Sequence, residues 1–110
     1  MIRITTHVLD TALGRPAAGV PVRLERAGGE GAPVAQSLTD SEGRVRDWLP
    51  EGVAPGRYRL VFGTGEWMRA TGRDSLYPEI GIDVELREGE RHYHLPVLLA
   101  PHGYTTYRGS

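Results

Sequence analysis

Two histidines in alternate positions near the C-terminal end are the residues best suited to chemistry. In a β-strand, side chains two residues apart lie on the same face, so His92 and His94 would project together. Leu98 would share that face, whereas the opposite face would be the core side and would carry Tyr93, Leu95, Val97 and Leu99. Imidazoles beside apolar surface suit a pocket or a subunit interface. This segment is therefore the first candidate for a functional site.

The same histidines admit two other interpretations. His7 could add a third imidazole to His92 and His94, and three imidazoles are a known ligand set for catalytic zinc. No carboxylate has an obvious spacing for such a site, so we expect neither a metal nor another cofactor. Alternatively, the two histidines could simply cover an exposed strand. We expect His92 and the remaining histidine, His102, to be surface or interface residues.

Composition excludes several classes of function. The chain of 110 residues has a formal net charge of −1 and scattered arginines, so we expect neither nucleic acid nor a membrane as a partner. It contains no cysteine and no lysine, which rules out thiolate nucleophiles and Schiff-base chemistry. No stretch approaches the ~18 apolar residues of a membrane span. We therefore expect one cytoplasmic domain over residues 1–110.

Alternation of apolar and polar residues predicts a chain built mainly from β-strands. Residues 2–9 alternate, and the pattern recurs before the histidine strand at residues 20–25, 34–38, 44–49, 57–62 and 80–87. A glycine-rich turn is expected over residues 27–33, and a short helix over residues 66–71 that ends at Gly72. About eight short strands with glycine and proline turns and one helix favour an all-β, antiparallel β-sandwich.

The strand pattern also predicts which candidate side chains face away from the core. In residues 2–9, His7 lies opposite the core-facing set Ile2, Ile4, Thr6 and Val8. Residues 39–43 have the composition of a tight turn, and Arg44 and Arg46 then face outward while Val45 and Leu49 face the core. His7, Arg44 and His94 thus fall independently on the outer faces of their strands.

Four motifs spread along the chain carry a family resemblance. They are THVLDTALGRPAAGVPV, TDSEGR, GEWMRATG before YPE, and HYHLPVLLAPHGYTTYRGS, whose terminal Tyr-Arg-Gly-Ser is the most specific element. Together they resemble the 5-hydroxyisourate hydrolases, the transthyretin-related enzymes of purine breakdown. The resemblance covers essentially the whole chain and implies a transthyretin-like sandwich. Thr105, where serine is common in that family, lies outside the expected catalytic set.

The resemblance implies a set of site residues and a reaction. The site would be lined by the HVLD histidine, the arginine that closes the TDSEGR turn, the second histidine of HYH and the terminal tetrapeptide. The reaction would open a ring of 5-hydroxyisourate with water and give 2-oxo-4-hydroxy-4-carboxy-5-ureidoimidazoline, without a cofactor, in a homotetramer built as a dimer of dimers. In this sequence the implied residues are His7, Arg44, His94, Tyr107, Arg108, Gly109 and Ser110.

The residue types fit this chemistry. An imidazole titrates near neutrality and can accept a proton from attacking water, and we favour His94 in this role with His7 as its partner. Arg44 stays protonated and can offset the charge of a tetrahedral intermediate. Gly109 is expected to permit a turn that brings the carboxylate of Ser110 toward the histidine strand, where it would raise the pKa of an imidazole.

Each assignment has an alternative. By facing alone, Arg46 is nearly as good a candidate as Arg44, and Tyr107 could be a core aromatic residue. Transthyretin itself carries small aromatic hormones on this architecture, so a non-enzymatic ligand-binding module is the main rival function. A structural domain like those of surface adhesins is a third interpretation, although the chain lacks the lysine that isopeptide cross-links require.

Overall fold

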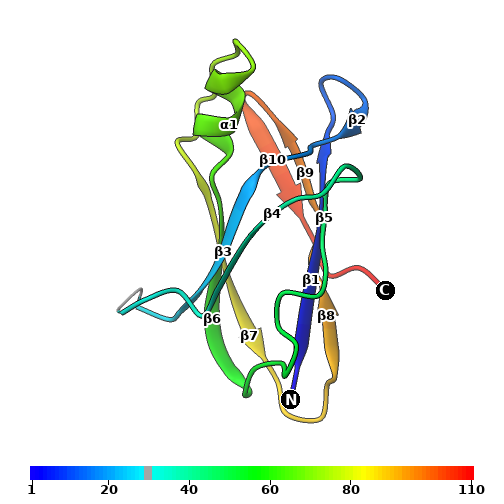
Figure 1. Ribbon diagram of the computed structural model, residues 1–110, viewed down its shortest axis with the longest axis vertical. Helices are drawn as coiled ribbons and strands as arrows, with labels where there is room; N and C mark the ends of the chain where they lie inside the picture. The colour runs from blue at the N-terminus through cyan, green and yellow to red at the C-terminus, as the bar shows by residue number, and fades with distance from the viewer. Residues whose placement is uncertain (29–30) are drawn as a thin grey trace.

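Two β-sheets pack face to face around the hydrophobic core (Figure 1). The computed structural model describes residues 1–28 and 31–110. The first sheet has the order β10 (Gly103–Thr106), β9 (Val97–Ala100), β1 (Arg3–Asp10) and β2 (Arg15–Pro16), with β5 (Arg44–Val45) and β8 (His92–His94) also paired to β1. The second has the order β4 (Ala35–Leu38), β3 (Pro21–Arg26), β6 (Gly56–Phe62) and β7 (Ile80–Leu86). The predicted sandwich is confirmed.

Strand β1 shows how the alternating pattern sets the two faces of a sheet. Its residues Ile4, Thr6, Val8 and Asp10 are each at most 1% exposed. Thr6 is tolerated in the core because its hydroxyl donates a hydrogen bond to the Leu95 carbonyl at 2.6 Å. The side chains between these positions are less buried, so they lie on the outer face of the sheet. The outer face is where the candidate residues were expected.

The first sheet departs from the predicted antiparallel pairing on one edge of β1. Along that edge β1 runs parallel to β8 and β9, with Thr5 opposite His94 and Val8 opposite Val97. A parallel neighbour needs a long crossover connection, and here the whole second sheet lies in the chain between β1 and β8. The other edge of β1 pairs antiparallel with β5 and β2.

Several strand boundaries differ from the sequence pattern. The histidine strand is split into β8 and β9 because Pro96 has no N–H to donate, although both pieces keep one register with β1. The core face predicted for this segment is confirmed, with Tyr93, Leu95, Val97 and Leu99 all buried. The predicted strand over residues 44–49 shortens to β5, and the short strand β2 forms where a loop was expected.

Helix α1 (Thr64–Ala70) closes one end of the sandwich between β6 and β7 (Figure 1). It ends as predicted, because Gly72 has a φ of +79° and donates to the Arg69 carbonyl while the N–H of Arg73 donates to the Met68 carbonyl. The predicted turn over residues 27–33 contains residues 29–30, which lie outside the described residues. In the described part of the chain, no helix is long and apolar enough to cross a membrane.

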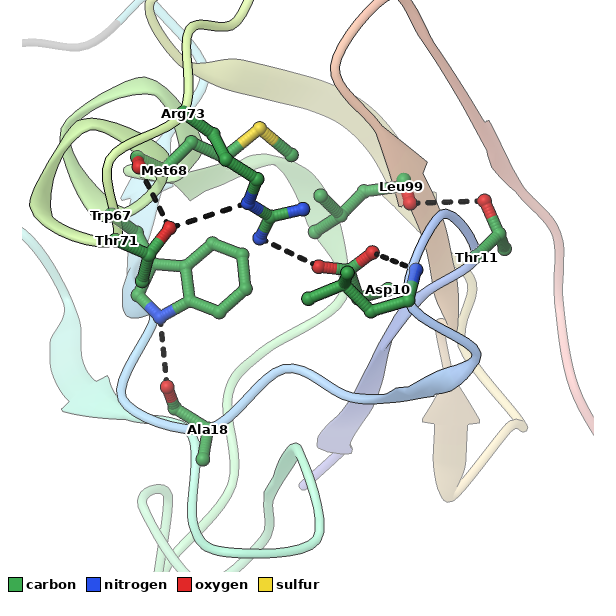
Figure 2. Close-up of polar contacts among 9 residues, drawn as sticks. Asp10, Thr11, Ala18, Trp67, Met68, Thr71, Arg73 and Leu99 are labelled. Atoms are coloured by element: carbon green, nitrogen blue, oxygen red, sulfur yellow. Dashed lines mark hydrogen bonds and ion pairs between the residues drawn. The ribbon is translucent and has the colours of Figure 1, made fainter.

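A buried ion pair ties the segment after α1 to the end of β1 (Figure 2). The guanidinium of Arg73 donates to the carboxylate of Asp10 at 2.7 Å and lies 5.4 Å from the ring centroid of Trp67. Burial acts to raise the pKa of Asp10, but hydrogen bonds from Arg73 and from the backbone of Leu13 and Ala12 outweigh it and lower that pKa. This end of β1 is therefore fixed in position.

Candidate active site

The candidate residues meet on the outer face of the first sheet, around the middle of β1. His7 lies directly opposite Arg44 of β5, and Thr5 lies directly opposite His94 of β8. Directly opposite side chains in a sheet have Cβ atoms about 4.5–5.5 Å apart. Pairing of β5 and β8 with β1 therefore brings Arg44 and His94 close to His7, within reach of one small molecule.

Arg44 is placed by the turn that precedes it. A side-chain oxygen of Asp40 accepts hydrogen bonds from the backbone N–H groups of Glu42 and Arg44, both at 2.9 Å. The pKa of Asp40 is held below its ordinary value by these bonds, mainly by the one from Arg44, although desolvation opposes them. Gly43 has a φ of +78°, and a Cβ there would lie 2.3 Å from the Val8 carbonyl oxygen. The turn thus fixes the start of β5 against β1.

His7 has one ring nitrogen engaged by this same turn. Its Nε2 lies 2.8 Å from the carbonyl oxygen of Glu42. A carbonyl oxygen only accepts, so Nε2 of His7 carries the proton and Nδ1 is the unprotonated nitrogen when the ring is neutral. Arg46, the rival of Arg44, instead pairs with Glu42 at 3.1 Å and is exposed.

His94 is half-buried and takes its hydrogen bond from β1. Its Nδ1 lies 2.8 Å from the hydroxyl oxygen of Thr5, and Nε2 of His92 lies 2.8 Å from the same oxygen. Burial, followed by the charges of Arg44, His92 and His7, lowers the pKa of His94 below its ordinary 6.5. His94 is therefore neutral at pH 7 and able to accept a proton.

The end of the chain folds over His94. The N–H of Gly109 donates to the His94 carbonyl at 2.7 Å, and the two residues form an isolated bridge. A Cβ on Gly109 would lie 2.7 Å from Cδ2 of the His94 ring. A residue with a Cβ would therefore be resisted at this position, but the reason is the His94 ring and not a left-handed backbone, since the φ of Gly109 is not in the positive range. Its role is to let the backbone approach the imidazole.

Two residues of the terminal tetrapeptide lie beside the site rather than over it. Arg108 stacks on the ring of Tyr93 at 4.1 Å and donates to Glu90 at 3.3 Å and to the His92 carbonyl at 3.0 Å. Tyr107 is 54% exposed, so it is not a core aromatic residue. Through these contacts, Arg108 holds the chain end against the start of β8.

An open hollow of about 280 Å³ lies over these residues. Its described lining brings together Arg44, His94 and Ser110 with Thr5, Thr6, Arg46 and His92. His7, Tyr107, Arg108 and Gly109 lie outside this lining. A wider hollow of about 1100 Å³ begins at the same Thr5, Arg46 and His92 and continues past Arg3 and Arg91. The site is therefore open on the side that carries these arginines.

The histidines are not grouped as the ligands of one ion. Thr5 stands between the rings of His92 and His94, whose centroids are 6.4 Å apart, and His7 is turned to Glu42. Within residues 1–28 and 31–110, no three His, Asp or Glu side chains are gathered as a metal site. The zinc alternative thus finds no support in the geometry.

Sequence reasoning left two members of this cluster without a role. Thr5 was not singled out, and His92, although it was placed on one face with His94, was expected to be a surface or interface residue. A signal was present for His92, because it shares a face with His94. The contact of Thr5 with both rings depends on the parallel register between β1 and β8, which alternation within each strand does not reveal.

A transthyretin-like sandwich with imidazoles and an arginine on the outer face of one sheet defines the class of protein. The model of the HIUase/Transthyretin family matches residues 4–109, and the chain belongs to this family. It is 47% identical to "5-hydroxyisourate hydrolase 2" of Rhizobium meliloti, over 98% of this chain and 96% of the relative. The resemblance noted in the sequence motifs is confirmed.

Solved structures agree with this assignment. The structure of Klebsiella pneumoniae 5-hydroxyisourate hydrolase is 42% identical, with a TM-score of 0.91 and full coverage of both chains. Sea bream transthyretin in complex with thyroxine is 28% identical, with a TM-score of 0.89, over 97% of this chain and 94% of that chain. Fold alone therefore does not separate a hydrolase from a carrier, and the side chains of the site must do so.

Proposed function

We propose that this protein hydrolyses 5-hydroxyisourate to 2-oxo-4-hydroxy-4-carboxy-5-ureidoimidazoline in urate catabolism. The observation that carries the proposal is the convergence of His94, Arg44 and the chain end at Ser110 on one hollow. His7, opposite Arg44, extends the same outer face. Relatives named 5-hydroxyisourate hydrolase at up to 47% identity support the substrate.

In the proposed reaction, His94 acts as the general base. Its Nδ1 is engaged by Thr5, so Nε2 is the nitrogen that can take a proton from a water attacking the ring carbonyl. Arg44 then offsets the negative charge that develops on the carbonyl oxygen. The rate should fall as the pH falls through the pKa of His94, which lies below 6.5, because the protonated ring cannot accept a proton.

His7, Tyr107, Arg108, Gly109 and Ser110 complete the proposed site in different ways. His7 presents an unprotonated Nδ1 beside Arg44 and can bind a substrate N–H. Gly109 and Arg108 fix the chain end against His94 and β8. Ser110 lines the hollow, but the prediction that its carboxylate raises the pKa of an imidazole is wrong for His94, whose pKa is lowered by burial and by neighbouring cationic groups. Its hydroxyl or carboxylate would therefore meet the substrate directly, and exposed Tyr107 would close over it.

We further propose a homotetramer, a dimer of dimers, with the sites at subunit contacts. The half-buried Leu9 and Leu98 face each other on the outer face beside the histidines, and this mixture of apolar and polar groups is typical of a covered surface. Light scattering tests this assembly, and a fully active monomer would refute it. The cytoplasmic location belongs to the same proposal and can be checked by cell fractionation.

Incubation with freshly generated 5-hydroxyisourate tests the function. The ultraviolet absorbance of the substrate should decay faster with the protein than without it, and dialysis against a chelator should leave the rate unchanged. A protein that does not accelerate the decay but binds small aromatic compounds would be a carrier, as the similarity to the thyroxine complex suggests. A rate that returns only with added zinc would instead favour a metal site.

A further inference from the structure

The hydroxyl of Thr5 is shared between two imidazoles. It lies 2.8 Å from Nδ1 of His94 and 2.8 Å from Nε2 of His92. A hydroxyl has one proton to donate, so it donates to one ring and accepts from the other. The tautomers of His92 and His94 are therefore linked through Thr5. If one ring switches from donating to accepting at Thr5, the other must switch from accepting to donating.

The two imidazoles differ in their surroundings. His94 is half-buried over the hollow, whereas His92 is exposed at the rim where the wider hollow begins. A charged ring is better hydrated at the exposed position, and burial is the largest cause of the lowered pKa of His94. A proton taken up by His94 is thus more stable after it has moved to His92.

We propose that His94, Thr5 and His92 form a relay that carries the proton abstracted from water out of the site, with His92 as its exit. This proposal rests on the proposed hydrolase function. At rest, His94 carries its proton on Nδ1 and donates to Thr5, which donates to Nε2 of His92. Nε2 of His94 is then bare and faces the substrate.

Each step of the relay conserves protons. Nε2 of His94 gains the proton of the attacking water, and the O–H bond of that water breaks as its oxygen bonds to the carbonyl carbon. The Nδ1 proton of His94 then passes to the Thr5 oxygen as the Thr5 proton passes to Nε2 of His92. His94 ends neutral with its proton on Nε2, and His92 carries the positive charge until it loses its Nδ1 proton to solvent.

The charged groups around the relay favour this release. Arg44 and His7 oppose a proton on His94, and the relay carries that charge away from them. The charged and titratable groups around the relay are Arg3 and His7 on β1, Glu42, Arg44 and Arg46 at β5 and the turn before it, Asp47, Glu90 and Arg91 at the rim, and Arg108 and the Ser110 carboxylate at the chain end.

The test combines two substitutions with two controls. Thr5→Val keeps the shape of the side chain but removes the hydroxyl, and His92→Gln removes the exit. We expect each to lower kcat by about tenfold with KM changed by less than about twofold, since general acid–base steps contribute ~10²–10⁴ and the relay carries only part of this. Thr5→Ser keeps the hydroxyl and should retain near wild-type kcat. His102→Gln, at another exposed histidine, should have no effect.

The double variant Thr5→Val with His92→Gln decides between a relay and two separate contributions. Residues that act as one unit are not additive, so the double variant should be no slower than the slower single variant. If the two losses multiply, or if Thr5→Ser is as slow as Thr5→Val, the relay is wrong. Melting temperatures identify a variant that fails to fold. If Thr5→Val fails to fold, His92→Gln and the tautomer measurement on the wild-type protein test the relay instead.

The tautomers can be measured without turnover. Nitrogen-15 chemical shifts of the imidazoles in the wild-type protein should show the Nδ1–H form for neutral His94 and neutral His92, and Thr5→Val should lose this preference. An Nε2–H form of His94 in the wild type would overturn the relay. This readout needs no substrate. A failed hydrolysis assay would therefore refute the proposed function, whereas the nitrogen-15 shifts separately test the hydrogen-bonded chain of His94, Thr5 and His92.

Discussion

The outer faces of the two sheets differ in how their arginines are paired with carboxylates. On the second sheet, arginines and carboxylates are matched across strands, with Arg59 on Asp83 at 2.8 Å and Arg57 on Glu85 at 3.8 Å. On the first sheet, Arg44 stands beside His7 and His94, and no ion pair of Arg44 occurs among the described residues. These arginines of the second sheet are thus neutralised by their neighbours, whereas Arg44 on the first sheet can offer its charge to a ligand.

The paired charges on the second sheet keep the protein surface hydrated, whereas Arg44 on the first sheet can take part in catalysis. Exposed pairs such as Arg59 with Asp83 contribute little to stability, because water already solvates both partners. An arginine that forms no ion pair on a half-buried face contributes little to folding, but its charge is available to a developing oxyanion. We therefore expect substitutions on the two faces to affect different properties.

The largest expected effects are on turnover at the first face. His94→Ala should lower kcat about a thousandfold, and Arg44→Ala and His7→Ala at least about a hundredfold, as expected for the loss of a general base and of an oxyanion donor. Melting temperatures should stay near wild type because all three side chains lie on the outer face. Arg46→Ala is the matched control. If it is the damaging arginine variant and Arg44→Ala is silent, the arginine assignment is wrong.

The Asp10–Arg73 pair should show what a buried charge contributes to stability. Asp10→Asn leaves Arg73 without its carboxylate and should lower the free energy of unfolding by about 3 kcal/mol at pH 7. The folded pKa of Asp10 is lowered, so its contribution is present above the ordinary pKa of 3.8 and is lost as the pH falls below it. Denaturant titrations should therefore show the difference between the two proteins shrinking below about pH 4. A constant difference would contradict this account.

Changes at the chain end should perturb the first face without unfolding it. Gly109→Ala places a Cβ against the His94 ring and should lower kcat by about ten- to a hundredfold by displacing the base. Deletion of residues 107–110 should do at least as much, and should cost far more in turnover than in stability, although the lost Arg108 contacts will lower the melting temperature somewhat. A short extension after Ser110 moves the carboxylate but keeps every side chain. If the extended protein matches wild type, the carboxylate is not needed.

The smallest effect should come from the second face. Arg59→Ala removes an exposed pair and should leave the free energy of unfolding nearly unchanged, with unchanged kcat. The difference between the faces would be lost if Arg59→Ala slowed turnover as strongly as Arg44→Ala. Chemical denaturation and the absorbance assay on the same preparations make this comparison.

The faces of the strands could be predicted from the sequence because a period of two is a local property. Ile4, Val8, Val45 and Leu99 are buried where alternation put them, and His7 lies across from Arg44 on the other face. Pairing between distant strands is not local, so the parallel alignment of β1 with β8 could not be derived from the pattern. The two-residue strand β2 is too short to leave a periodic signal.

The site could be predicted in part for the same reason. Residue types and motifs identified His7, Arg44, His94 and the chain end. Arg44 is held by its own turn, but the hydrogen bonds that orient His7 and His94 come from segments far away in sequence. Thr5 reaches His94 only because of the strand register, and Gly109 is needed because its backbone passes over an imidazole. Neither contact has a signature in the residues next to it.

The parallel pairing of β1 with β8 also bears on how the protein folds. Thr5 and His94 are 89 residues apart in the chain, so the loop that joins them closes only after nearly every other segment has been synthesised. Contacts of such long range slow folding, and one edge of β1 stays unpaired until β8 pairs with it. An incomplete chain can form much of the second sheet, but it cannot assemble the histidine cluster. Catalytic competence and completion of the sandwich should therefore appear in the same kinetic phase of refolding.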